Sequence, residues 1–86
     1  MDVQAAAITI LGKPFVVVLV GEELVQNAGE ADMAIESFRN KFKGAPVVLM
    51  AQKEDGTPSY YGDQDLVQSL RGVPAEKMPW KAYHLR

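Results

Sequence analysis

The stretches FVVVLV, at residues 15–20, and VVLMA, at residues 47–51, are apolar at every position. Side chains of a strand alternate between the two faces of a sheet, so a strand that is apolar throughout must be covered on both faces. The link between the two stretches is long enough to be a crossover between parallel strands. The sequence therefore predicts a small α/β domain with two parallel central strands.

The segment between the central strands is predicted to form a helix over residues 29–43. Its apolar side chains recur at spacings of three and four residues and form one stripe: Ala31, Ala34, Ile35, Phe38 and Phe42. Acidic residues gather in its first half and basic residues in its second, as the helix dipole favours. Gly44 follows where a helix commonly ends. Residues 21–27, before the helix, are predicted to be a polar, mildly acidic connection.

Each central strand is predicted to have an antiparallel partner. Residues 7–11 precede the first central strand across the short connector at residues 12–14, and the polar Thr9 between two isoleucines predicts an edge strand. Residues 59–61 follow the second central strand across the polar turn at residues 53–58, which has Asp-Gly at its centre. The two hairpins thus place their outer strands on either side of the central pair.

The rest of the chain is predicted to contain a second helix and a tail. Asp63 fits the N-cap of a helix that reaches about Leu70, and Gly72 closes it. Residues 73–86 are predicted to be a C-terminal tail packed on a single domain that spans residues 1–86. The predicted fold class is α/β (α+β) with the order ββαββα. It has a mixed four-stranded sheet with two helices, and strands two and three are central.

The segment from Ala45-Pro46 through the second hairpin, Gly62 and the helix that follows resembles the closing strand-hairpin-helix segment of thioredoxin-fold proteins. The resemblance covers about half of the chain. It implies a backbone arrangement that includes a special Pro46 peptide. The redox cysteine pair of that family is missing, and the resemblance implies no activity.

The composition argues against several classes of protein. The 86 residues include no Cys, so neither a disulfide nor a thiolate metal site can stabilise the chain. No apolar run approaches the ~20 residues of a membrane span, and the acidic Asp2 stands where a secretory signal needs positive charge. A cytoplasmic protein with no membrane partner is therefore predicted. The net charge of −2 lacks the basic bias of a nucleic-acid binder.

Residues that usually carry chemistry are scarce. Only His84 fits a conventional general base, and the serines lie in no nucleophile pattern. Asp63 and Asp65 match no calcium-binding loop, so they are interpreted as a helix cap and an acidic first turn. No glycine-rich phosphate-binding loop is present. We therefore predict no catalytic residues, no cofactor and no metal site.

The predicted interaction residues are aromatic and basic: Tyr60, Tyr61, Trp80, Lys81, Tyr83 and His84. Adjacent strand residues point to opposite faces, so at least one of the two neighbouring tyrosines is exposed or covered by something else. The aromatic side chains of the tail either pack on the sheet with their basic neighbours in water, or stack on single-stranded nucleic acid. The acidic net charge favours packing.

The sequence thus predicts a small non-enzymatic interaction or accessory protein that binds another protein or itself. A homodimer is expected if both helices lie on one face of the sheet, because the other face would then expose an apolar patch. One helix on each face would instead give a monomer. Two alternatives are a nucleic-acid-associated accessory protein that uses the tail, and a small-molecule-binding or catalytic domain with a site near Tyr60, Tyr61 and Asp63.

Overall fold

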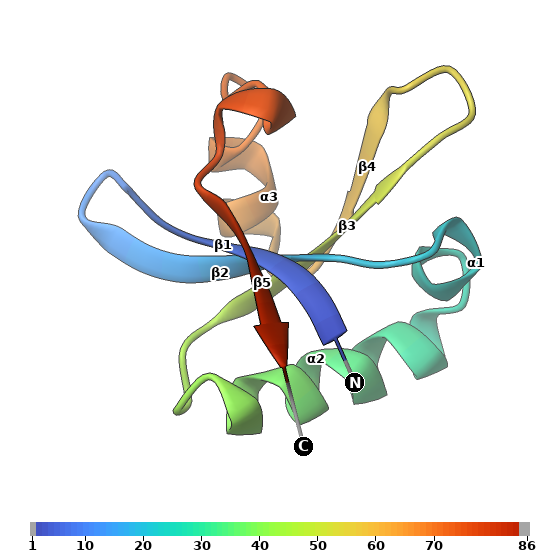
Figure 1. Cartoon of the computed structure of the whole chain (residues 1–86), viewed down its shortest axis with the longest axis horizontal. Helices are drawn as coiled ribbons and strands as arrows, with labels where there is room; N and C mark the ends of the chain where they lie inside the picture. Colours follow the sequence, from blue (N-terminus) through green and yellow to red (C-terminus); the bar gives the residue numbers. More distant parts are fainter. Residues whose placement is uncertain (1, 85–86) are drawn as a thin grey trace.

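The structure, a computed structural model, describes residues 2–84, which form a five-stranded sheet with helices on both faces (Figure 1). The elements in chain order are β1 (Asp2–Ile10), β2 (Lys13–Leu19), α1 (Glu22–Val25), α2 (Ala28–Lys41), β3 (Val47–Gln52), β4 (Pro58–Tyr61), α3 (Gln64–Ser69), the 3-10 helix η1 (Ala75–Lys77) and β5 (Trp80–His84). The strand order is β4-β3-β2-β1-β5. The predicted mixture of helices and strands is confirmed. None of the helices in this part of the chain is both long and apolar enough to cross a membrane.

The two apolar stretches form β2 and β3, which are adjacent and parallel. Each of these strands has a neighbour on both sides, and their side chains enter two separate cores. Val16 and Val18 belong to the core under α2, whereas Val17 belongs to the core under α3. The alternation along a fully apolar strand therefore produces a three-layer arrangement, with the sheet between two helices.

The stripe of α2 packs on one face of the sheet, and Phe38 at its centre is only 6 % exposed. The Asn27 side chain caps the helix by accepting the Glu30 N–H at 3.1 Å. At the other end Gly44 adopts φ +84° and donates its N–H to the Arg39 carbonyl at 2.7 Å, which closes the last turn. The helix spans residues 28–41 rather than the predicted 29–43.

The second face is covered by α3 and η1. Asp63 caps α3 by accepting the Asp65 N–H at 2.9 Å, and Leu66 and Leu70 of this segment are buried in the same core as Phe15. Figure 1 shows α2 and α3 on opposite sides of the sheet. An uncovered apolar face would require both helices on one side of the sheet, and this condition is not met. The expectation of a homodimer that depended on such a face therefore fails.

The predicted four strands and two helices differ from the five strands and three α-helices of residues 2–84. The tail at residues 73–86 supplies η1 and β5, and residues 85 and 86 lie outside the described part. β5 pairs antiparallel with β1. The prediction of an edge strand at the N-terminus is therefore wrong, because β1 lies between β2 and β5. Ala5 and Ala6 are consequently buried, one on each face.

Local sequence signals explain the two missed elements. In β5 the apolar Trp80 and Tyr83 are three residues apart and face opposite sides, so the strand lacks the alternation that marks a half-buried strand. α1, inside the predicted connection at residues 21–27, has only four residues, which is too short for a helical periodicity. After Pro46 the chain forms β3, β4 and α3 in that order. No peptide bond within residues 2–84 is cis, and the Pro46 carbonyl accepts the Val16 N–H at 2.9 Å.

Candidate functional site

A groove of about 840 Å³ opens where the parallel strands β2 and β3 begin, between α2 on one side and α3 on the other. This volume lies within the range of roughly 300–1,000 Å³ that is typical of ligand sites. The residues that line it are Gly12, Lys13, Pro14, Asp32, Ile35, Arg39, Pro46, Val47, Tyr61, Gly62, Asp63, Asp65 and Leu66. The groove therefore draws on both helices, on the β1–β2 turn and on the start of both central strands.

Gly62 shapes the groove where β4 passes into α3. Its φ of +154° is rarely adopted by residues with a side chain, and a Cβ atom there would lie 3.3 Å from the Val48 Cα atom and 3.4 Å from the Val47 carbonyl oxygen. The missing side chain lets the chain pass close to β3 before Asp63 begins the helix. Both the backbone conformation and the limited space therefore favour glycine at this position.

The β1–β2 turn forms one end of the groove. Leu11 and Gly12 have φ values of +52° and +78°, as in the two-residue turns that match the twist of a hairpin. The turn begins one residue before the predicted connector at residues 12–14, and Lys13 is already the first residue of β2. Leu11 is 91 % exposed at the tip, while Lys13 and Pro14 line the groove. The turn thus places a cationic side chain and a proline ring at one end of the groove.

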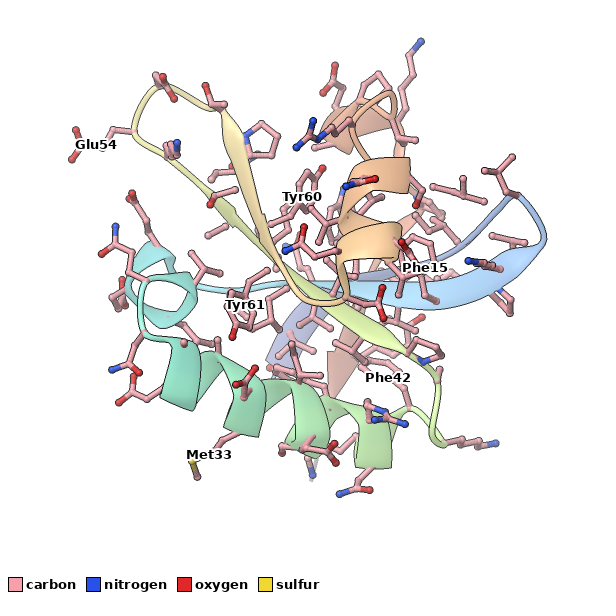
Figure 2. All side chains as sticks on the ribbon, turned by 180° about the vertical axis from the view of Figure 1, so that it is seen from behind. Phe15, Met33, Phe42, Glu54, Tyr60 and Tyr61 are labelled. Atoms are coloured by element: carbon pink, nitrogen blue, oxygen red, sulfur yellow. The ribbon has the colours of Figure 1, made fainter. Side chains whose placement is uncertain are left out.

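A hydrogen bond fixes the tyrosine of the groove. The Tyr61 hydroxyl donates to Asp32 Oδ1 at 2.9 Å and so connects β4 with α2. This bond raises the pKa of Tyr61 above its ordinary value, with smaller contributions from burial and from the negative charge of Asp32. The phenol therefore remains protonated at neutral pH. Figure 2 shows Tyr61 on the α2 side of the sheet and Tyr60 beside α3.

Charges of both signs surround an apolar floor. Lys13 and Arg39 are the cations, and Asp63 and Asp65 carry negative charge at the start of α3. The floor is made of aliphatic side chains and proline rings: Pro14, Ile35, Pro46, Val47 and Leu66. Arg39 Nη1 lies 3.4 Å from Glu36 Oε1 in an exposed contact, which leaves the guanidinium largely available. Among the described residues, those that line the groove include no Ser, Thr, Cys or His.

Metal binding receives no support from the described side chains. Within residues 2–84, no three His, Cys, Asp or Glu side chains gather closely enough to hold an ion. Two of the three carboxylates that line the groove have structural partners: Asp32 accepts from Tyr61, and Asp63 accepts from the backbone of Asp65. The chemistry that the groove offers is hydrogen bonding, charge and apolar contact.

The predicted interaction residues on β4 separate as expected, because Tyr60 and Tyr61 face different cores. The Tyr60 hydroxyl is buried and has no hydrogen-bond partner among the described residues. Burial raises the pKa of Tyr60. Of the six predicted interaction residues, Tyr61 alone lines the groove.

The aromatic residues predicted in the tail pack against the domain. Trp80 lies in the core under α3, where its Nε1–H donates to the Ala75 carbonyl at 2.7 Å. Tyr83 lies against the core under α2 and meets the Phe42 ring edge-on, with centroids 5.2 Å apart. Both rings are thus engaged within the chain.

The basic residues predicted in the tail lie in solvent. Lys81 is exposed, and His84 Nδ1 lies 2.6 Å from Asp2 Oδ1 with both side chains exposed. Tyr60 and Tyr61 belong to one edge strand and the tail residues to the other, so four strand spacings of roughly 4.8 Å separate them. The six predicted residues therefore do not form one site.

Sequence reasoning missed the α2 residues of the groove. From the sequence, Asp32 and Arg39 are explained only as charges that follow the helix dipole. Their spacing of seven residues is two helical turns and places both on one side of α2, with Ile35 between them. That spacing is a usable signal, although only the fold shows which elements face it.

Comparison of the chain with protein-family models, curated proteins and solved structures finds no match.

Proposed function

We propose that the protein is a non-enzymatic binding module that holds an extended segment of another protein in the groove between α2 and α3. The observation that carries the proposal is the lining of this groove, which combines an apolar floor with cations and carboxylates on separate elements. Ligand sites typically have this make-up, with few polar groups set in a mainly apolar surface.

A peptide segment fits the lining because it can supply all three kinds of group. Apolar side chains of the segment would contact the floor, an acidic side chain would meet Lys13 or Arg39, and a basic one would meet Asp63 or Asp65. Within residues 2–84, the lining holds no hydroxyl, thiol or imidazole beyond the Tyr61 phenol, which donates to Asp32. Binding rather than nucleophilic chemistry is the activity that such a lining supports.

The nucleic-acid alternative depends on aromatic rings that are free to stack on bases. Trp80 and Tyr83 contact the two cores of the domain, so the observations favour a protein partner. The small-molecule alternative uses the same groove and becomes an outcome of the experiment below.

The test is a selection from a library of random displayed peptides on the purified chain, followed by affinity measurements on variants. Arg39→Glu reverses a charge in the groove, and Lys41→Glu makes the same change on α2 outside the lining. Enriched peptides should bind the wild type and Lys41→Glu alike and should lose about tenfold or more in affinity for Arg39→Glu.

Nuclear magnetic resonance locates the bound peptide independently. Addition of an enriched peptide should shift resonances of Ile35, Tyr61 and Leu66 more than those of the opposite sheet edge. Failure to enrich any peptide, equal affinity for both charge reversals, or shifts confined to other surfaces would refute the proposal. Binding of a small-molecule library alone at these residues would support the alternative instead.

A further inference from the structure

The outer edge of β5 is an unpaired strand edge. Within residues 2–84 no strand follows β5 in the sheet, so one row of its backbone N–H and C=O groups lacks a strand partner. The opposite edge strand, β4, has four residues and begins with Pro58, and both features discourage the addition of another strand. β5 has five residues and contains no proline. The two edges are therefore not equivalent.

We propose that β5 pairs antiparallel with β5 of a second copy about a two-fold axis at Ala82. The two sheets then form one continuous sheet in which Ala82 faces Ala82 of the other copy. The β5 edge is separate from the groove, which lies at the start of β2 and β3 and is lined by no β5 residue.

Symmetry restricts the possible registers to a few. The two-fold axis must be perpendicular to the sheet, so residues that face each other come from the same face of the two copies, and the axis passes at a residue. An axis at Lys81 would place two lysines opposite each other and bring Pro79 opposite Tyr83. An axis at Tyr83 would pair only residues 82–84 of the strand. An axis at Ala82 pairs all five residues of β5.

Side chains are complementary in the register centred on Ala82. Trp80 lies opposite His84 of the other copy, and Lys81 lies opposite Tyr83. Lysine on an edge strand ordinarily opposes strand addition, but here its ammonium group meets an aromatic ring, a favourable cation–π pairing. No like charges stand directly opposite each other.

Existing contacts hold two of these side chains in place. Tyr83 is oriented by its edge-on contact with Phe42, and His84 by Asp2. Ala82 is exposed and small, so two copies of it can approach within the roughly 4.5–5.5 Å between Cβ atoms of directly opposed residues. The outer edge of β5 thus has an oriented side chain on each face of the sheet, and the small Ala82 leaves space at the proposed two-fold axis.

Because the chain contains no cysteine, single cysteines report this register directly. Ala82→Cys places two thiols opposite each other, whereas Ala7→Cys makes the same change at an exposed alanine beyond the β1–β5 pairing. Under mild oxidation, Ala82→Cys should form a disulfide-linked dimer roughly tenfold or more faster than Ala7→Cys, because disulfides require closely approaching Cβ atoms. Equal rates would overturn the proposal.

Sedimentation equilibrium at high micromolar concentration tests the assembly without cross-linking. The wild type and Ala7→Asp should have twice the 9.4 kDa mass of one chain, and Ala82→Asp, which opposes two carboxylates at the axis, should have the mass of one chain. Circular dichroism confirms that each variant is folded. A monomeric wild type, or a dimeric Ala82→Asp, would overturn the proposal.

Discussion

Gly62 connects the edge of the sheet to α3 in a backbone conformation that residues with side chains rarely adopt, and β3 leaves little space for a methyl group. Gly62→Ala should therefore lower the free energy of unfolding by about 1–3 kcal/mol, as measured by denaturant titration. The matched control is Gly72→Ala, because an added Cβ there meets no atom within 4 Å. Its effect should stay within about 0.5 kcal/mol. Equal losses in the two variants would contradict this account of Gly62.

Two neighbouring tyrosines should respond in opposite ways to loss of the hydroxyl. Tyr60→Phe removes a buried hydroxyl without a partner and should raise the free energy of unfolding by about 1 kcal/mol. Tyr61→Phe removes the donor to Asp32 and should lower it. Thermal and denaturant unfolding of both variants measure the signs. A change in the same direction for both would show that the two environments are not as described.

Titration of these tyrosines should make stability fall at high pH. Hydrogen bonding to Asp32 is the main cause that raises the pKa of Tyr61, and burial raises that of Tyr60. Since the pKa values are raised in the folded state, the stabilisation is complete below about pH 10 and is lost as pH rises through the folded-state values. The wild type should therefore lose stability more steeply than the Tyr60→Phe/Tyr61→Phe variant. Parallel profiles of unfolding free energy against pH would contradict this.

At the scale of elements, α2 shows what can be predicted from sequence. Its apolar stripe recurs from Ala31 to Phe42, its charges follow the dipole, and Gly44 follows its end, so several independent signals agree. β5 lacks such agreement. Its aromatic residues point to opposite faces, and its partner strand β1 lies at the other end of the chain.

Phe38→Ala tests the packing of α2. Truncating this buried ring should cost about 3–5 kcal/mol, because the lost apolar contact leaves a cavity against the sheet. Met33→Ala on the same helix is the control, since Met33 is 75 % exposed and its truncation should change stability by less than about 0.5 kcal/mol. The midpoints of urea unfolding compare the two. A near-wild-type midpoint for Phe38→Ala would remove it from the core.

At the scale of the whole molecule, the groove illustrates a limit of sequence reasoning. Asp32 lies far along the chain from Tyr61 and Asp63, and the three residues meet because the crossover and the second hairpin return to the same end of the sheet. The parallel central pair could be predicted from local patterns. The strand order beyond it could not, because β5 joins β1 through a pairing between the two ends of the chain.

Removal of residues 78–86 tests how the two cores depend on the last strand. Trp80 and Met78 contribute to the core under α3, and Tyr83 to the core under α2, so the truncation opens both. The shortened chain should unfold at markedly lower denaturant concentration and bind a dye that reports exposed apolar surface. Unchanged stability would contradict the packing of β5.

Asp2, at the start of β1, pairs with His84, at the end of β5, so the ends of the described chain lie side by side (Figure 1). A molecule stretched by these two points carries the load on a single antiparallel ladder, loaded from one end. The hydrogen bonds of this ladder then break one after another, because the force acts on one bond at a time. The protein is therefore mechanically soft along the line that joins its ends, however stable it is to heat or denaturant.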